Sequence, residues 1–231
     1  MSSGLFVART AERERVRPED KNLKQVEGWN PEDFAREQIQ GLIRQVFFSS
    51  AERPVRQVVF SAAEAQTDMQ NLCWRVGEAL ALETSGDIAL VGEYPQALRD
   101  AGSRTREIAS PVEESSGGLR QAATRVGPNL WIVPPVGNAN VNSGLLNSYL
   151  AGVRSQFEYS IVVGLPVAES NAAMATAQLA DGIVLVLSAH YTRRITARKI
   201  KEKLEAAQAR LLGTVLSDRT FPIPERIYRR L

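Results

Sequence analysis

The sequence contains few of the residues from which metal sites, disulfide frameworks and membrane spans are built. Cys73 is the only cysteine and His190 the only histidine in 231 residues. One cysteine excludes an internal disulfide, which fits a reducing cytoplasm, and this pair of residues argues against a zinc site. No uninterrupted apolar run approaches the about 20 residues of a membrane-spanning helix. We interpret Cys73 as a buried small hydrophobe and His190 as an ordinary surface residue.

Glycine and lysine are missing from the loop 62–70, which follows an apolar run at 58–60 and precedes a segment with helical periodicity. A strand, a loop and a helix in this order are typical of a phosphate-binding unit. Glycines let such a loop curl closely around phosphates, and a lysine supplies the positive charge. Here the loop carries Glu64 and Asp68, which would repel phosphates. The sequence therefore predicts the architecture of a nucleotide site without its chemistry.

Further apolar runs predict a β-sheet, because they recur between segments with helical periodicity. The runs are continuous and not alternating, so both faces of the sheet should be covered, and the repeated strand–helix–strand order favours parallel strands. The expected strands are 58–60, 88–91, 130–133, 161–163, 183–187 and 214–216. The expected helices are 31–47, 70–83, 143–156, 171–179 and 194–211. We predict one doubly wound α/β domain over residues 29–218, with a weakly patterned stretch at 96–128.

The two ends of the chain differ from this domain in composition. Residues 1–28 are rich in mixed charge and poor in apolar side chains, which predicts a disordered tail. Residues 219–231 alternate apolar residues and prolines before a basic end, and we expect an extended tail. The net charge is +2, but residues 1–192 carry a balance of −5 and residues 193–231 a balance of +7. This basic part is either a solvated helix face with a tail or a surface for an anionic partner.

The last predicted helix has the clearest ends. Thr192 is a good candidate for its N-cap, and Gly213 for its C-cap. Arg193 and Arg194 stand at its start, where positive charge opposes the helix dipole. They are either solvated or mark contact with an anion or a partner.

Several segments together resemble one family. These are FEYSIVVGLP at 157–166, LADGIVLV at 179–186, TRR at 192–194 and GTVL at 213–216. The chain resembles, from about residue 33 to 217, the cytoplasmic tyrosine kinase domains of bacterial capsule and exopolysaccharide assembly. These domains belong to the MinD/ParA-like P-loop ATPases, so the resemblance implies a P-loop NTPase-like fold.

The resemblance implies nucleotide-site residues that this chain replaces. The phosphate-binding loop corresponds to the positions of Glu64, Thr67, Asp68 and Met69, and the closing strand ends in Ser217 where the family has asparagine. The metal-holding aspartates fall at Gly92, Tyr94 and Val163. In the helix that resembles the family's self-assembly segment, Glu37 is kept, but Gln40 and Ile43 replace two arginines. We therefore expect no catalytic residue, no bound nucleotide or other cofactor, and no metal.

The leading hypothesis is a non-catalytic interaction or regulatory module of capsule or exopolysaccharide biosynthesis and export. Its partner would be a membrane-bound chain-length or export protein, and it could form a homo-oligomer or a hetero-oligomer with an active relative. It would be cytoplasmic, or peripheral at the inner membrane through that partner. The candidate interaction residues are Arg193, Arg194, Tyr228, Arg229 and Arg230.

Two alternatives stay open. One is an ATP- and magnesium-dependent tyrosine kinase or ATPase with a rearranged site that uses Glu93, Asp181 or Asp218, with Tyr228 as a phosphate acceptor. The other is a ParA-like binder of membrane surfaces or nucleic acid through the basic C-terminal part, although we do not expect nucleic acid as a partner.

Overall fold

The computed structural model describes residues 31–49, 53–95, 118–136 and 143–218. The expected tails, 1–28 and 219–231, lie outside the described residues, as do Tyr228, Arg229 and Arg230. Within the described ranges no helix is both long and apolar enough to cross a membrane.

Seven strands form one sheet in the order β3-β4-β2-β5-β1-β6-β7. All neighbours pair in parallel except β3, which runs antiparallel to β4. The six strands expected from the apolar runs are all present, and β3 within the weakly patterned stretch is an addition. The strands are β1 (Gln57–Ala62), β2 (Ile88–Val91), β3 (Thr124–Arg125), β4 (Leu130–Val133), β5 (Tyr159–Val163), β6 (Gly182–Ser188) and β7 (Leu211–Ser217).

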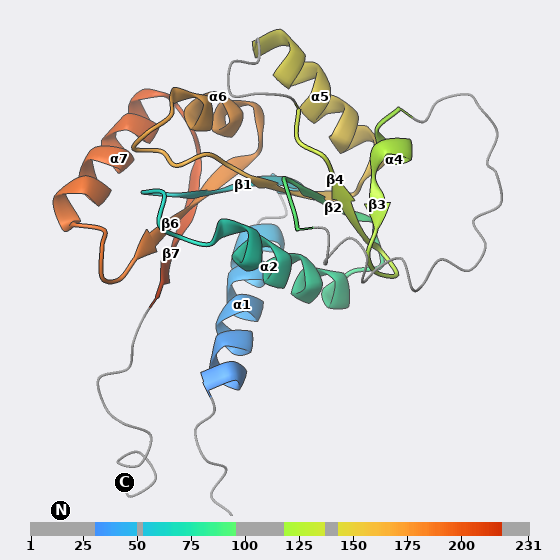
Figure 1. Ribbon diagram of the computed structural model, residues 1–231, viewed down its shortest axis with the longest axis horizontal. Coiled ribbons are helices and arrows are strands. Elements are labelled where there is room, and N and C mark those ends of the chain that lie inside the picture. Colours follow the sequence, from blue (N-terminus) through green and yellow to red (C-terminus); the bar gives the residue numbers. More distant parts are fainter. Residues whose placement is uncertain (1–30, 50–52, 96–117, 137–142, 219–231) are drawn as a thin grey trace, which may run out of the picture.

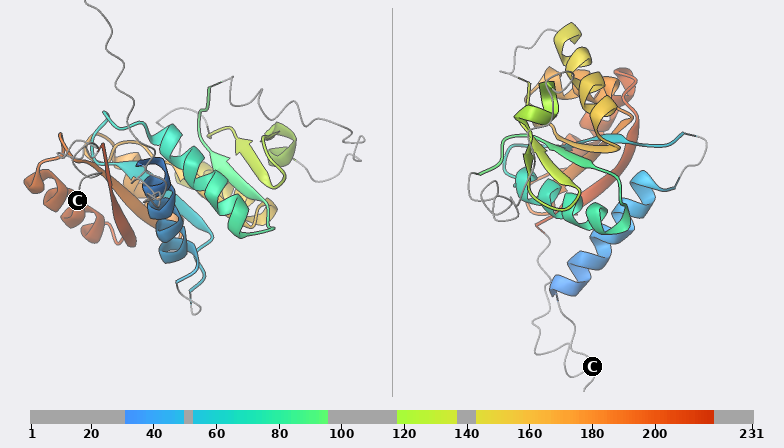
Figure 2. Two further views of the ribbon diagram at one scale, coloured as in Figure 1. Left: turned by 90° about the horizontal axis from the view of Figure 1, so that it is seen from below. Right: turned by 90° about the vertical axis from the view of Figure 1, so that its right-hand side faces the viewer.

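Helices cover both faces of the sheet (Figure 1). One face packs against α1 (Pro31–Phe47) and α2 (Met69–Glu83). The other packs against α5 (Ser143–Gln156), α6 (Asn171–Leu179) and α7 (Arg194–Ala206), with the short α4 (Gly118–Ala122) beside α5. The turned views in Figure 2 show the same layers, and show α1 projecting beyond the sheet. The doubly wound α/β fold is thereby confirmed.

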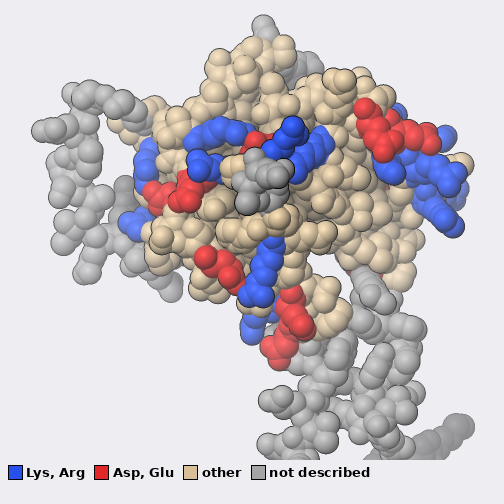
Figure 3. Space-filling view, turned by 180° about the vertical axis from the view of Figure 1, so that it is seen from behind, with Lys and Arg blue, Asp and Glu red and all other residues tan. Residues whose placement is uncertain are grey.

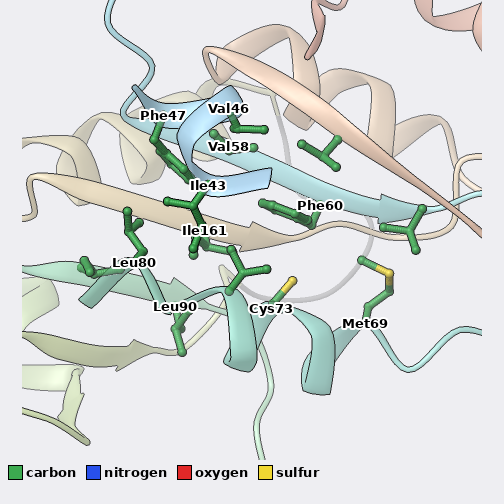
Figure 4. Packing of buried hydrophobic residues seen from close by; sticks show 14 of the residues in the cluster. Ile43, Val46, Phe47, Val58, Phe60, Met69, Cys73, Leu80, Leu90 and Ile161 are labelled. Carbon is green, nitrogen blue, oxygen red and sulfur yellow. The ribbon is translucent and has the colours of Figure 1, made fainter. Parts of the chain in front are cut away.

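Alternate residues of each strand enter the two hydrophobic cores. Phe60, Leu90 and Ile161 face α1 and α2, where Ile43 of α1 is fully buried against them (Figure 4). Val59, Val91 and Val162 face the opposite helices. This two-sided burial explains why the strands are continuous apolar runs.

Cys73 is fully buried between α2 and the sheet (Figure 4), as predicted. Burial, and secondarily the negative charge of Asp68, raises the pKa of the thiol far above its ordinary value. Since the thiolate is the nucleophilic form, Cys73 is an inert part of the core.

The last helix is shorter than predicted. It ends at Ala206, so Leu211 and Gly213 lie in β7 and Gly213 does not cap it. Its end is a Schellman motif: the Ala209 N–H donates to the Leu204 carbonyl oxygen, and the Gln208 N–H to that of Glu205. Gln208 takes the left-handed position (φ 54°) that glycine usually fills. The helix can therefore stop early enough for Leu211 to pair with Ile183 in the sheet.

Gly182 and Gly213 form a matched pair for testing this edge of the sheet. A Cβ on Gly182 would lie 2.7 Å from the Arg210 carbonyl oxygen and 2.6 Å from Leu212 Cγ, whereas a Cβ on Gly213 meets nothing within 4 Å. Because backbone cannot move aside cheaply, we expect Gly182→Ala to lower the free energy of unfolding by about 1–3 kcal/mol. Gly213→Ala should be neutral or slightly stabilising. Urea unfolding measures both, and equal effects would contradict the close approach.

Candidate functional site

The candidate site lies where the parallel strands end. In open parallel sheets, ligands bind at this carboxyl edge. Here β1 at the centre leads into the loop 63–68 and α2, with β5 and β6 on its two sides. This is the position of the expected phosphate-binding loop.

The N-terminus of α2 is occupied by the chain's own carboxylate. Asp68 is the N-cap residue, and its Oδ1 accepts a hydrogen bond of 3.0 Å from the Asn71 N–H. In phosphate-binding loops, such N–H groups and the positive end of the helix dipole face the ligand. Asp68 supplies the negative charge at this place, so an incoming phosphate would meet an anion.

Glu64 adds a second carboxylate to the same loop. The Thr192 Oγ1 lies 3.3 Å from Glu64 Oε2 as a donor, and it accepts a hydrogen bond of 3.1 Å from the Ser188 N–H. Thr192 thus joins the loop to the end of β6 and does not cap α7, contrary to prediction. The α7 N-cap is Arg193, which makes no side-chain capping bond.

Lysine is absent from the loop and from most of the fold. After residue 24 the only lysines are Lys199, Lys201 and Lys203 of α7, all exposed. Lys201 pairs with Glu205 on the same helix at 3.4 Å.

Thr67 and Met69 are the other two positions of the expected loop, and they are half-buried and buried respectively. Neither side chain carries a charge that could bind a phosphate.

At the end of β2 and β5, the structure brings three of the predicted positions together in a packed contact. A Cβ on Gly92 would lie 2.9 Å from Val163 Cγ2 and 3.3 Å from the Tyr94 ring. Tyr94 is only 5% exposed, and its ring centroid lies 6.3 Å from that of Trp74 on α2. Gly92, Tyr94 and Val163, the positions at which the resemblance implies metal-holding aspartates, thus form an apolar plug.

The Tyr94 hydroxyl is buried and has no hydrogen-bond partner among the described residues. Burial, and to a lesser extent neighbouring Cys73, raises the pKa of this phenol well above its ordinary value. Tyr94 is therefore neutral at physiological pH and supplies no negative charge for a cation. This burial has no local signal in the sequence, because Tyr94 stands between Glu93 and Pro95 outside any apolar run.

Ser217, the last predicted position, is bonded within the sheet edge. Its Oγ lies 3.2 Å from the Leu187 carbonyl oxygen and 3.0 Å from Asp218 Oδ2, two acceptors for its single hydroxyl proton.

The three acids of the enzymatic alternative do not come together. Asp181 precedes β6 and accepts hydrogen bonds of 2.8 Å from the N–H groups of Arg56 and Gln57, at the opposite edge of the sheet. Glu93 follows β2 and Asp218 follows β7, four strand spacings away in the sheet order, which corresponds to about 19 Å. The described residues also contain no cluster of three or more histidine, cysteine or acidic side chains able to hold a metal.

The turn between β6 and α7 presents several polar residues to solvent. His190, Arg193 and Arg194 are all exposed there, and Tyr191 is 65% exposed. The arginines are thus accessible, as an interaction role requires.

The fold matches solved structures of kinases and ATPases. The kinase domain of Escherichia coli tyrosine kinase ETK aligns over 90% of this chain and 86% of its own, with a TM-score of 0.61 and 14% identity. The MinD cell division protein of Aquifex aeolicus aligns over 75% of this chain and 74% of its own, with a TM-score of 0.56 and 15% identity. A ParA family ATPase from Chlorobium tepidum aligns over 76% of this chain and 79% of its own, with a TM-score of 0.53 and 11% identity.

The chain has a P-loop NTPase-like fold. The resemblance to bacterial tyrosine kinase domains and MinD/ParA ATPases is confirmed at this level. No family model matches the sequence, and no curated protein matches it either. The chain therefore shares this fold with the ETK kinase domain at 14% sequence identity.

Replacing Asp68 tests the capping contact. Asp68→Ala removes the acceptor for the Asn71 N–H and should lower the free energy of unfolding by about 0.5–2 kcal/mol. Asp68→Asn keeps an acceptor oxygen at the N-cap and should cost a few tenths of a kcal/mol at most. Chemical denaturation of both variants measures the difference. An alanine variant as stable as the asparagine variant would show that the cap is not formed.

Asp181 predicts a dependence of stability on pH. Burial alone would raise its pKa, but the N–H groups of Arg56 and Gln57 and the Arg154 guanidinium outweigh burial and hold the pKa below its ordinary 3.8. Its contribution is therefore complete above about pH 4 and is lost as the pH falls through the lowered pKa. At pH 7, Asp181→Ala should lower the free energy of unfolding by about 1–2 kcal/mol, because it removes the acceptor of the exposed Arg56 N–H and the part-buried Gln57 N–H. The difference in the free energy of unfolding between this variant and the wild type should become smaller below about pH 4. Glu93→Ala, at an exposed position, is the control and should show neither effect.

Proposed function

We propose that the chain is a non-catalytic interaction or regulatory module built on a P-loop NTPase-like fold, a pseudokinase or pseudo-ATPase. The observation that carries this proposal is the Asp68 carboxylate at the α2 N-terminus, where a triphosphate would need free N–H groups and positive charge. The second carboxylate of Glu64 and the apolar plug at Gly92, Tyr94 and Val163 support it.

The rate enhancement that the missing lysine and metal-holding acids would supply is large, so we infer a complete loss of phosphoryl transfer and not slow catalysis. The reaction depends almost entirely on positioning and on stabilisation of charge by lysine, magnesium and the acids that hold the metal. One lost stabilising group typically costs about 10²-fold or more. In this chain the lysine and the metal-holding acids are replaced together, and Glu64 and Asp68 add repulsion.

The biological setting follows from the resemblance to polysaccharide-assembly kinases. We place the chain in capsule or exopolysaccharide biosynthesis and export, bound to a membrane-bound chain-length or export protein. It would act in the cytoplasm, or at the inner membrane through that partner, as a homo-oligomer or together with an active relative.

The geometry of α1 bears on how such an assembly would form. Glu37 is exposed on this helix, but Ile43 is fully buried against the sheet. The position of Ile43, where the family has an arginine, is therefore part of the core and is not available to a neighbour. An assembly would need a surface other than this face of α1.

Calorimetric titration with ATP and magnesium tests the proposal. We expect no heat of binding at micromolar protein and nucleotide, because the loop offers two carboxylates and no lysine. An active bacterial tyrosine kinase domain titrated under the same conditions serves as the positive control. Micromolar affinity of this chain for ATP would contradict the degenerate site.

Radiolabelled ATP separates the enzymatic alternative from the proposal. Purified protein alone should not transfer label to Tyr228 or to any other tyrosine. Label on the purified chain would establish a kinase, whereas label that requires an added active relative would agree with the proposed module.

A further inference from the structure

A groove runs between α7 and the outer strands of the sheet, apart from the degenerate nucleotide site. Its volume is about 520 Å³. Its floor is apolar and consists of Leu185 and Leu187 of β6 with Leu211 of β7. Because α7 does not cover β7 completely, Leu216 at the end of that strand is 55% exposed.

The wall of the groove is formed by α7 and carries three cationic and two acidic side chains. Arg194, Arg198 and Lys201 line it, together with Glu202 and Glu205. Lys201 pairs with Glu205 at 3.4 Å, whereas neither arginine forms an ion pair with an acidic side chain of the described residues. Both arginines are also near the positive end of the helix dipole. Figure 3 shows charged side chains crowded at the end of the molecule that α7 forms.

The groove lies beside the β7 edge of the sheet. β7 is the last strand in the sheet order and pairs only with β6, so no described segment bonds to its other side. The strand is seven residues long, and Thr214 faces the groove from it. An unpaired strand edge of this length is a template for one more strand, whose side chains would alternate between groove and solvent.

We propose that this groove and the β7 edge bind an acidic, extended segment of a partner protein by strand addition. Main-chain hydrogen bonds to β7 would hold the segment, apolar side chains would cover Leu187 and Leu216, and its acids would pair with Arg194 and Arg198. The inference goes beyond the proposed function and rests on it only in treating the chain as an interaction module.

The chain's own C-terminal segment is a poor occupant on grounds of charge. Residues 219–231 contain four arginines and a single acid, Glu225. They would bring further positive charge to Arg194 and Arg198. A segment of the opposite sign from another protein satisfies both the apolar floor and the basic wall.

Fluorescence anisotropy with the full chain tests this inference. The probe is a labelled eight-residue peptide, Thr-Glu-Thr-Val-Thr-Glu-Thr-Val, in which glutamate and valine take turns at the groove-facing positions and threonine occupies the solvent-facing ones. Its control has lysine in place of glutamate. We expect the acidic peptide to bind and the lysine peptide not to bind. Amides of β7 should become protected from hydrogen exchange when the acidic peptide is present, because strand addition pairs them.

Two double variants of equal charge change locate the site. Arg194→Glu with Arg198→Glu should weaken binding about tenfold or more, since two pairs are replaced by repulsion. Lys199→Glu with Lys203→Glu changes the same helix outside the groove and should weaken binding by less than about threefold at physiological salt. Circular dichroism and unfolding midpoints check that both variants fold.

Several results would overturn the inference. These are equal weakening by both double variants, unchanged exchange of the β7 amides on binding, or equally tight binding of single-stranded DNA of the same charge. Binding that appears only when the chain is shortened to end at Asp218 would assign the groove to the chain's own tail. Because none of these measurements involves nucleotide, failure here is distinguishable from the ATP titration.

Discussion

The position of β1 determines what the rest of the molecule can do. Every residue of this strand is buried, with β5 on one edge, β6 on the other, and helices over both faces. Since the strand cannot shift, the loop 63–68 and the start of α2 are held at the centre of the carboxyl edge. A ligand at the centre of that edge would meet the side chains of this loop, and two of them, Glu64 and Asp68, are carboxylates.

Much of the fold could be predicted from the sequence, because a strand that is buried on both faces is a continuous apolar run. Continuous apolar runs located six of the strands, and 3.6-residue periodicity located α1, α2, α5 and α6. The end of α7 was missed because a glutamine fills the left-handed position, so the sequence contains no stop signal there. The strand β3 has two residues, which is too short to show any periodicity.

The contacts within the candidate site could be predicted from the sequence only in part. The missing glycine and lysine predict a degenerate loop, which stays a prediction. An aspartate before a helix is a recognisable N-cap signal, but the capping role of Asp68 was not predicted. The burial of Tyr94 depends on Trp74 and on Gly92 packed against Val163, contacts between distant segments. Thr192 was assigned to the wrong partner for the same reason, since it bonds to Glu64 of another loop. Tertiary contacts of this kind have no local sequence pattern.

The apolar plug at Gly92 limits the side chains that can occupy this position. An aspartate introduced there would place its Cβ 2.9 Å from the Val163 side chain and bring a charge into a closed apolar contact. An acidic side chain at this position would therefore require a smaller residue at Val163 as well. The residues at positions 92 and 163 thus constrain each other's size, and packing at this contact opposes a carboxylate there.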